Sequence, residues 1–251
     1  MAKREEKQSE DFIIGRNASL EVLKGDRDVN KVFIQEKLDD RRIEEIEQAA
    51  KKRRLIVNFV PKSKLDKLSN NQAHQGVVVA VSAMEYATLD DLFAVADGRN
   101  EEPFFILLDE LEDPHNLGAI MRTADAAGAH GIIITKHRAV GLTSTVSKAS
   151  AGAIEHVKVA RVTNMVDTIK TLKDRGMWIF GTDVEGEPLR KWNASGAVAI
   201  VIGNEGSGIS RLVKENVDGM VTIPMAGHVQ SLNASVAAAL VMYEVFQQRH
   251  E

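Results

Sequence analysis

The sequence predicts a two-part α/β protein, in which a small α/β unit precedes a larger unit built on a parallel sheet. Short β-like runs alternate with helical patterns along the chain. In the second part these runs are continuously apolar, as expected for strands that helices cover on both faces. We place the boundary at residues 82–88, so that residues 1–84 form the first domain and residues 85–251 the second.

In the first domain, β-like and helical patterns follow one another in short segments. Pro61 ends the third β-like run, and Ile43 and Ile46 have helical spacing. Residues 1–11 are polar and charged, without the apolar segment of a secretory signal, and predict a flexible tail. The expected strands are 13–14, 31–35, 55–60 and 75–81, and the expected helices are 17–24 and 41–52.

The second domain repeats the alternation more strongly. It begins with a predicted helix at 88–97, for which Thr88 is the expected N-cap. A closing helix at 232–247 places Leu232, Val236, Leu240 and Tyr243 on one face. The other expected strands are 104–109, 131–135, 155–159, 177–181, 198–202 and 219–223, and the other expected helices are 116–127, 144–151, 166–175 and 210–215. In such sheets, ligands bind beyond the carboxyl ends of the strands.

Composition excludes several kinds of chemistry. The 251 residues include no cysteine, which excludes disulfides, thiolate nucleophiles and cysteine-based metal sites. The 7 histidines are scattered without metal-ligand spacing, so we expect no metal. No apolar run is long enough to span a bilayer, and we expect a cytoplasmic protein without a membrane partner.

The net charge of −4 is divided unevenly between the two domains. Residues 1–84 carry +3 and residues 85–251 carry −7. A basic first domain is compatible with nucleic-acid contact, although the run Lys51–Arg54 also fits a solvated helix end.

The glycine-rich loop at 203–208 follows a predicted strand. A phosphate-binding Walker loop would need Lys where Ile209 stands, and a dinucleotide fingerprint would need a third glycine and an earlier place in the chain. What remains is a turn that carries Asn204 and Glu205 between glycines, which permit close approach of a ligand to the backbone. Ser210 is a plausible N-cap for the next helix.

Two other loops after predicted strands carry polar side chains. In the first, Asn116 can cap a helix that contains Arg122, and this arginine needs an anion, either Asp125 or a ligand. In the second, Ser231 caps the closing helix, so that Ser231 and Asn233 stand at a helix N-terminus, where polar and anionic ligands bind.

Three motifs in order carry a family resemblance: N-x-G-x-x-x-R at 116–122, I-G-N-E-G-x-G at 202–208, and I-P-M with S-L-N-A-S at 223–235. Together they resemble the SpoU, or TrmH-like, family of RNA ribose 2′-O-methyltransferases of the SPOUT class. The resemblance implies S-adenosylmethionine as methyl donor, a homodimer, and a deep trefoil knot in the parallel-sheet domain. The first domain looks like the RNA substrate-binding domain of the ribosomal members, with a fold like that of ribosomal protein L30e.

The resemblance also implies site residues. The catalytic set is Asn116, Arg122, Glu205, Ser231 and Asn233. The cofactor-binding set is Thr182, Gly203, Ile223, Met225 and Leu232. The RNA-binding set is Arg122 with Arg16 and His74, which lie in the first-domain motifs Ile14–Asn17 and His74–Gly76. We expect no metal-binding residues.

Within this family, the likeness points to members that methylate a guanosine in the peptidyl-transferase region of 23S ribosomal RNA. Because guanidinium stays protonated, we expect Arg122 to clamp a phosphate and bond the ribose oxygen, oriented by Glu205 and Asn116. The alternatives are a tRNA methyltransferase, a non-catalytic RNA-binding ribosome-assembly factor, and an oxidoreductase, which the missing dinucleotide fingerprint disfavours.

Overall fold

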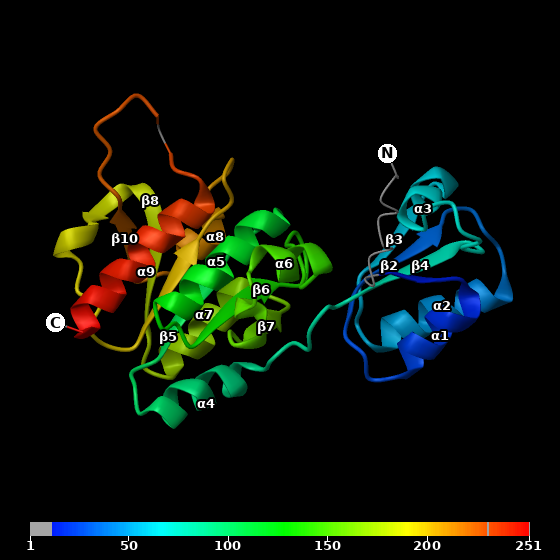
Figure 1. The fold of residues 1–251 in the computed structure, drawn as a ribbon, viewed down its shortest axis with the longest axis horizontal. Coiled ribbons are helices and arrows are strands. Elements are labelled where there is room, and N and C mark those ends of the chain that lie inside the picture. The colour runs from blue at the N-terminus through cyan, green and yellow to red at the C-terminus, as the bar shows by residue number, and fades with distance from the viewer. Residues whose placement is uncertain (1–11, 230, 251) are drawn as a thin grey trace, which may run out of the picture. The chain divides into compact units, whose positions relative to one another are not determined.

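The computed structural model describes residues 12–229 and 231–250, and the chain divides into two units (Figure 1). The first unit ends at Glu85 and includes Leu142–Ser144; the second begins at Tyr86. The tail expected at residues 1–11 lies outside the described residues.

The first unit is a four-stranded mixed sheet with the strand order β1-β4-β2-β3. Strand β4 is antiparallel to both β1 and β2, whereas β2 and β3 are parallel. Its strands are β1 (Phe12–Ile14), β2 (Val29–Gln35), β3 (Val57–Val60) and β4 (Val77–Val81), and its helices are α1 (Arg16–Lys24), α2 (Arg41–Lys52) and α3 (Lys62–Leu68).

Helices α1 and α2 bury their apolar stripes against this sheet. Leu20 and Leu23 of α1 join Ile43 and Ile46 of α2 in one cluster with the inner residues of β2 and β4. The sequence prediction missed α3, a helix of 7 residues whose single buried side chain is Leu65. One buried side chain leaves no helical period to detect.

The second unit is a six-stranded parallel sheet with the order β10-β8-β9-β5-β6-β7. The predicted α/β class, with a small α/β domain ahead of a parallel-sheet domain, is therefore confirmed. The strands are β5 (Phe104–Leu108), β6 (Gly131–Thr135), β7 (Val159–Val162), β8 (Trp178–Pro188), β9 (Val198–Ile202) and β10 (Gly219–Thr222). The trefoil knot implied by the resemblance stays a prediction.

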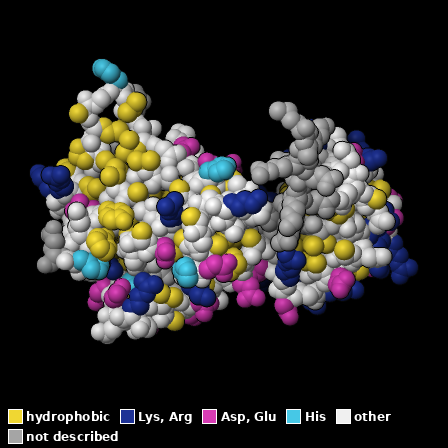
Figure 2. Space-filling view, viewed as in Figure 1, with side chains coloured by type: hydrophobic (Ala, Val, Ile, Leu, Met, Phe, Trp, Pro, Cys, Tyr) yellow, Lys and Arg dark blue, Asp and Glu magenta, His cyan; other side chains and the backbone are white. Residues whose placement is uncertain are grey.

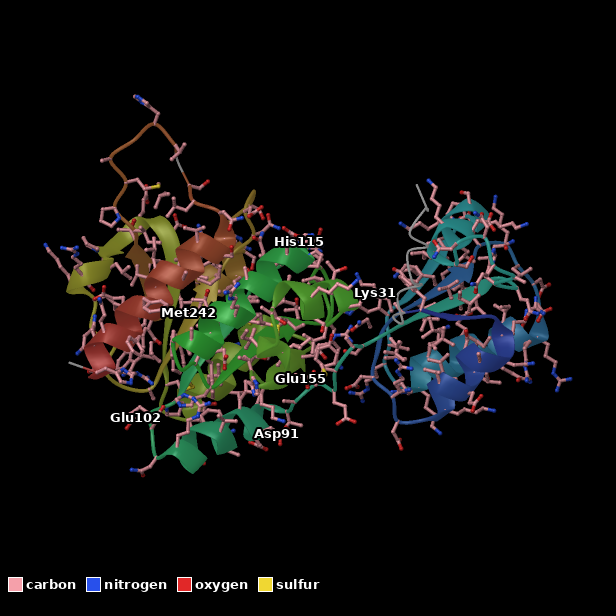
Figure 3. The ribbon with its side chains drawn as sticks, in the orientation of Figure 1. Lys31, Asp91, Glu102, His115, Glu155 and Met242 are labelled. Atoms are coloured by element: carbon pink, nitrogen blue, oxygen red, sulfur yellow. The ribbon has the colours of Figure 1, made fainter. Side chains whose placement is uncertain are left out.

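Helices cover both faces of this sheet. One core cluster joins α4 (Leu89–Arg99), α7 (Met165–Asp174) and α8 (Arg211–Lys214) to alternate residues of β5, β8 and β9. On the other face, α5 (Pro114–Ala126) lies beside α9 (Ala234–His250), and the fully buried Met242 lies where the two helices meet (Figures 1 and 3). The remaining helix is α6 (Ser144–Ala149). Two short 3₁₀ turns complete the unit: Ala153–Glu155 precedes β7, and Leu189–Lys191 follows β8.

Two expectations about elements are wrong. The strand expected at 155–159 is instead a 3₁₀ turn at Ala153–Glu155, followed by β7 at Val159–Val162. Residues 155–159 alternate polar with apolar side chains only from His156 to Val159, which is too short a pattern to fix a strand, and pairing with β6 decides where the strand begins. The closing helix begins at Ala234, and Val236, Leu240 and Tyr243 on its expected apolar face are exposed, whereas Ala238, Val241 and Val245 are buried.

Candidate active site

Loops that follow adjacent strands meet at the carboxyl ends of β5 and β9. Asp109 follows β5, and its Oδ2 accepts a hydrogen bond of 2.7 Å from the backbone N–H of Ser210. Asn204 follows β9, and its Nδ2 donates to the carbonyl oxygen of Glu110 at 2.9 Å. These bonds tie the glycine-rich loop to the loop that leads into α5. The polar loops therefore form one site, as the parallel sheet predicts.

Three of the predicted catalytic residues meet in one hydrogen-bonded cluster. Glu205 Oε1 accepts from Asn116 Nδ2 at 2.8 Å and from Asn233 Nδ2 at 2.5 Å. Asn233 Nδ2 also lies 3.0 Å from Asn116 Oδ1. Asn116 and Asn233 are 117 positions apart in the chain. The cluster joins all three sequence motifs, and it fixes the position of the Glu205 carboxylate at the start of α9.

Two helix caps differ from the sequence expectation. Asp113 caps α5 by accepting the N–H of His115 at 2.9 Å, so Asn116 lies inside the first turn and its side chain is free to reach Glu205. Asn233 Oδ1 accepts the N–H groups of Ser235 and Val236 at 2.9 and 3.3 Å, so it is Asn233, not Ser231, that caps α9. Short Asp and Asn side chains bond the amides two and three residues onward.

Ser210 stands at the start of α8 but makes no side-chain cap bond. Its role in the structure is the backbone bond to Asp109.

A cavity of about 670 Å³ lies beside the cluster. All five predicted cofactor-binding residues line it, together with Glu205 and Ser231. The five are Thr182, Gly203, Ile223, Met225 and Leu232. Gly203 is required for space, because a Cβ there would lie 2.3 Å from the backbone carbon of Gly208 and 2.4 Å from the nitrogen of Ile209. A cavity of this volume suits a nucleoside-sized ligand.

Asp183 and Lys214 also line the cavity, and sequence reasoning missed both. They form an ion pair between β8 and the last residue of α8. Burial acts to raise the pKa of Asp183, but hydrogen bonds from Lys214 and from the N–H groups of Val184 and Glu185 outweigh it and lower that pKa. They belong to none of the three motifs, so no pattern in the sequence marked them.

The structure does not bring Arg122 to the cluster. Arg122 is exposed, and its side chain forms no hydrogen bond or ion pair, with Asp125 or otherwise, within residues 12–229 and 231–250. Arg122 is six positions after Asn116 on α5, which places the two side chains about 120° apart around the helix and about 9 Å apart along it. Glu205 and Asn116 therefore bond each other and do not orient Arg122 in this chain.

The two motifs of the first unit meet at the start of α1. Arg16 Nε donates to the carbonyl oxygen of Gln75 at 2.9 Å, and its Nη1 pairs with Asp40 at 2.9 Å. His74 is buried, with Nε2 3.0 Å from Asp66 Oδ1 and Nδ1 accepting from the N–H of Gly76. Arg16 is partly exposed, whereas the His74 ring is enclosed by its own domain.

Neither a metal centre nor a membrane span is found in the part of the chain that the structure describes. No cluster of three or more His, Cys, Asp or Glu side chains there could hold a metal ion. No helix among those residues combines the length and the apolar character needed to cross a bilayer.

Comparison with known proteins identifies the second unit. Residues 103–243, more than half of the chain, match the model of the SpoU rRNA Methylase family. The chain belongs to this family. Residues 12–87 of this SpoU family member match a second model, described as RNA 2′-O ribose methyltransferase substrate binding. The second match covers most of the first unit, and the first match lies in the second unit except at Leu142–Ser144.

Relatives and solved structures resemble the chain over most of its length. YacO of Bacillus subtilis (strain 168), assigned to the TrmH family of tRNA/rRNA methyltransferases, is 54% identical over 97% of this chain and 98% of its own. The SpoU methyltransferase AviRb from Streptomyces viridochromogenes, solved with AdoMet, is 28% identical with a TM-score of 0.61, covering 95% of this chain and 90% of its own. A TrmH/SpoU tRNA modifying enzyme of A. aeolicus is 30% identical with a TM-score of 0.55, covering 60% of this chain and 77% of its own.

Proposed function

We propose that this SpoU family member transfers a methyl group from S-adenosylmethionine to the ribose 2′-hydroxyl of a guanosine in the peptidyl-transferase region of 23S ribosomal RNA. The observation that carries the proposal is the Asn116–Glu205–Asn233 cluster at the edge of a cavity of about 670 Å³. The family membership and the AdoMet-bound AviRb structure support the same chemistry.

The residues around the cavity fit this cofactor. Ile223, Met225 and Leu232 supply an apolar wall, and Gly203 leaves the backbone bare, where a Cβ could not stand. When bound, S-adenosylmethionine supplies an activated methyl group. The protein's contribution is to fix the acceptor ribose next to that group and to bear the charge that develops on its oxygen.

The cluster and Arg122 have separate tasks in this proposal. Glu205, held by two amides, and Ser231, exposed on the cavity wall, position the ribose. Arg122 is exposed and unpaired within the described residues, so its guanidinium is available to bind the phosphate next to the target nucleotide. Proton removal from the hydroxyl is not assigned to Arg122, since guanidinium stays protonated.

The first domain supports ribosomal RNA over tRNA. The tRNA modifying enzyme of A. aeolicus matches 60% of this chain, and a protein solved in work on methylation of C/U34 on tRNA matches 59% of this chain with 96% of its own. With 96% of its own length in the match, that second relative covers too little of this chain to include both units. We propose that Arg16 contacts RNA there, and that the buried His74 shapes the 74–76 loop for that contact.

A homodimer is part of the proposal. Val236, Leu240 and Tyr243 follow one another at helical spacing on α9 and are between 44% and 48% exposed. Figure 2 shows hydrophobic side chains gathered over α9 and the base of the loop before it. An apolar stripe left open on a single chain is typical of a surface that a second copy covers.

The deciding experiment offers labelled S-adenosylmethionine with unmodified 23S, 16S and tRNA transcripts and then maps the methylated ribose. We expect label in 23S RNA at one guanosine. Label in tRNA alone would overturn the substrate choice, and absence of label in every RNA, with cofactor bound, would favour the non-catalytic assembly factor.

Arg122→Ala should lower methylation at least about 100-fold at saturating RNA, because the phosphate loses its charged partner. Arg190→Ala, which removes another exposed guanidinium outside the cavity lining, is the matched control. Turnover of Arg122→Ala close to that of the wild type would exclude the clamp.

A further inference from the structure

The cavity carries an ion pair that the three sequence motifs leave unexplained. Its charged lining residues, among those described, are Asp183, Glu205 and Lys214. Glu205 is held by the amides of Asn116 and Asn233, so the charged lining residues that the catalytic cluster leaves out are Asp183 and Lys214. They come from β8 and α8, whereas the catalytic cluster comes from α5, from the loop after β9 and from the residue before α9.

The pair is fixed in place but not saturated. Asp183 Oδ1 accepts the N–H of Val184 at 2.7 Å, and Oδ2 accepts from Lys214 Nζ. The side chains of Asp183 and Lys214 keep 21% and 41% exposure. The ammonium group of Lys214 has three N–H donors, and only one of them bonds to a described residue, Asp183. The other two donors, and lone pairs of the Asp183 carboxylate, are open to a ligand.

Two opposite charges side by side match a ligand that has two opposite charges side by side. In S-adenosylmethionine only the amino-acid end does, since its α-ammonium and α-carboxylate sit on one carbon, whereas adenine and ribose are neutral and the sulfonium is a single positive charge. We propose that Lys214 binds the α-carboxylate and Asp183 the α-ammonium of the methyl donor. The apolar wall of Ile223, Met225 and Leu232 then takes the adenosyl part. This inference rests on the proposed cofactor.

A purely structural role predicts a different outcome. A partly exposed ion pair contributes about 0–1 kcal/mol to stability, so its loss should leave the fold intact. A charge-assisted contact with a ligand, by contrast, shows directly in affinity. The discriminating measurement is therefore binding of two ligands that differ only at the amino-acid end.

The experiment measures dissociation constants by calorimetry for S-adenosylhomocysteine, the demethylated form of the cofactor, and for 5′-methylthioadenosine. Both are neutral at sulfur, and only the first carries the amino acid. Lys214→Met should weaken S-adenosylhomocysteine at least about tenfold and leave 5′-methylthioadenosine within about twofold. Asp183→Asn should follow the same pattern, and Lys214→Arg should recover most of the loss. Arg211→Met and Glu215→Gln are matched controls, since this second ion pair also involves α8 but lies outside the cavity lining.

Two results would overturn the inference. If the affinities for both ligands fell equally, the ion pair would instead contact the ribose or maintain the shape of the cavity. Unchanged affinity for both would reduce it to a surface ion pair. The cofactor proposal fails separately, if the wild-type protein binds neither ligand. The choice of RNA is tested independently by the mapped nucleotide, which Lys214→Met should leave unchanged.

Discussion

Glu205 is the acceptor that holds the active-site loops together at the scale of single residues. Its Oε1 receives two side-chain amides, and the backbone N–H of Ala234 lies 3.4 Å away. Asn116, one of those donors, is 5% exposed. Removing the carboxylate therefore leaves a buried amide without its partner, which costs more than the mean value of one hydrogen bond.

Glu205→Ala should lower the free energy of unfolding by about 1–3 kcal/mol, because the Nδ2 of Asn116 loses its acceptor. Methylation should fall at least about 100-fold. Denaturant unfolding and single-turnover methylation measure the two effects. Glu215→Ala, an exposed glutamate outside the cavity, should stay within about 0.5 kcal/mol of the wild type. Wild-type turnover in Glu205→Ala would remove the cluster from the mechanism.

His130 is a buried titratable group that the mechanism does not use. Its Nδ1 accepts the N–H of Phe104 at 3.0 Å, so the ring is neutral at this nitrogen, and its Nε2 lies 2.9 Å from Glu101. Burial lowers the pKa of His130, against the opposing effect of Glu101, and the charges of Arg99 and Arg249 add to the lowering. Protonation would also break the bond from Phe104.

The lowered pKa of His130 predicts that acid destabilises the protein. The unfolded chain takes up the proton near pH 6.5, above the pKa of the folded form, so the free energy of unfolding should fall as the pH drops below about 6.5. One proton limits the slope to about 1.4 kcal/mol per pH unit. Denaturant unfolding of wild type and His130→Asn between pH 7.5 and 5 measures it. The difference between the two should shrink as the pH falls, and a constant difference would contradict the prediction.

At the scale of elements, the turn after β9 forms part of the cavity wall. Backbone of residues 208 and 209 folds back so closely on Gly203 that a Cβ would overlap it. Gly206 in the same turn has room, since its Cβ would meet nothing nearer than Asn204 Oδ1 at 3.5 Å. Gly203 is therefore required for space in this turn, whereas Gly206 is not.

Gly203→Ala should open the turn and weaken S-adenosylmethionine at least about tenfold, with about 1–3 kcal/mol of destabilisation, since backbone must move to admit the methyl group. Gly206→Ala should bind the cofactor within about twofold of the wild type. Calorimetry and thermal unfolding measure both variants. Equal affinity of Gly203→Ala and wild type would mean that the cofactor does not depend on this turn.

The elements were predictable to the extent that their patterns were local. The ranges 131–135 and 198–202 match β6 and β9, and the capping box at Thr88 is present as the N-cap prediction implies. The strand expected at 155–159 failed because its pairing partner, not its own residues, sets its start. The predicted N-cap residues of α5 and α9 were wrong by two or three positions, because several Asp, Ser and Asn side chains near each helix start can accept the free N–H groups.

At the scale of the whole molecule, the open stripe on α9 predicts self-association. Leu240→Glu should convert the dimer to a monomer, because it places a charge in the middle of the proposed apolar interface. Leu212→Glu, at an exposed leucine of α8, should stay dimeric. Sedimentation velocity distinguishes the outcomes, and a monomeric wild-type protein would end the dimer proposal.

The sequence by itself determined the α/β class, the parallel sheet, the three loops and the identity of the residues that line the cavity at Thr182, Gly203, Ile223, Met225 and Leu232. Apolar runs, glycines and caps are local signals, and the order of the motifs carries the family. Only the tertiary structure decided that Asn116, Glu205 and Asn233 bond one another, that Arg122 stands apart from them, and that Asp183 and Lys214 form a pair on the cavity wall. These relations depend on which strands are neighbours and on which side of a helix each side chain lies. Neither can be predicted from the sequence of one segment alone.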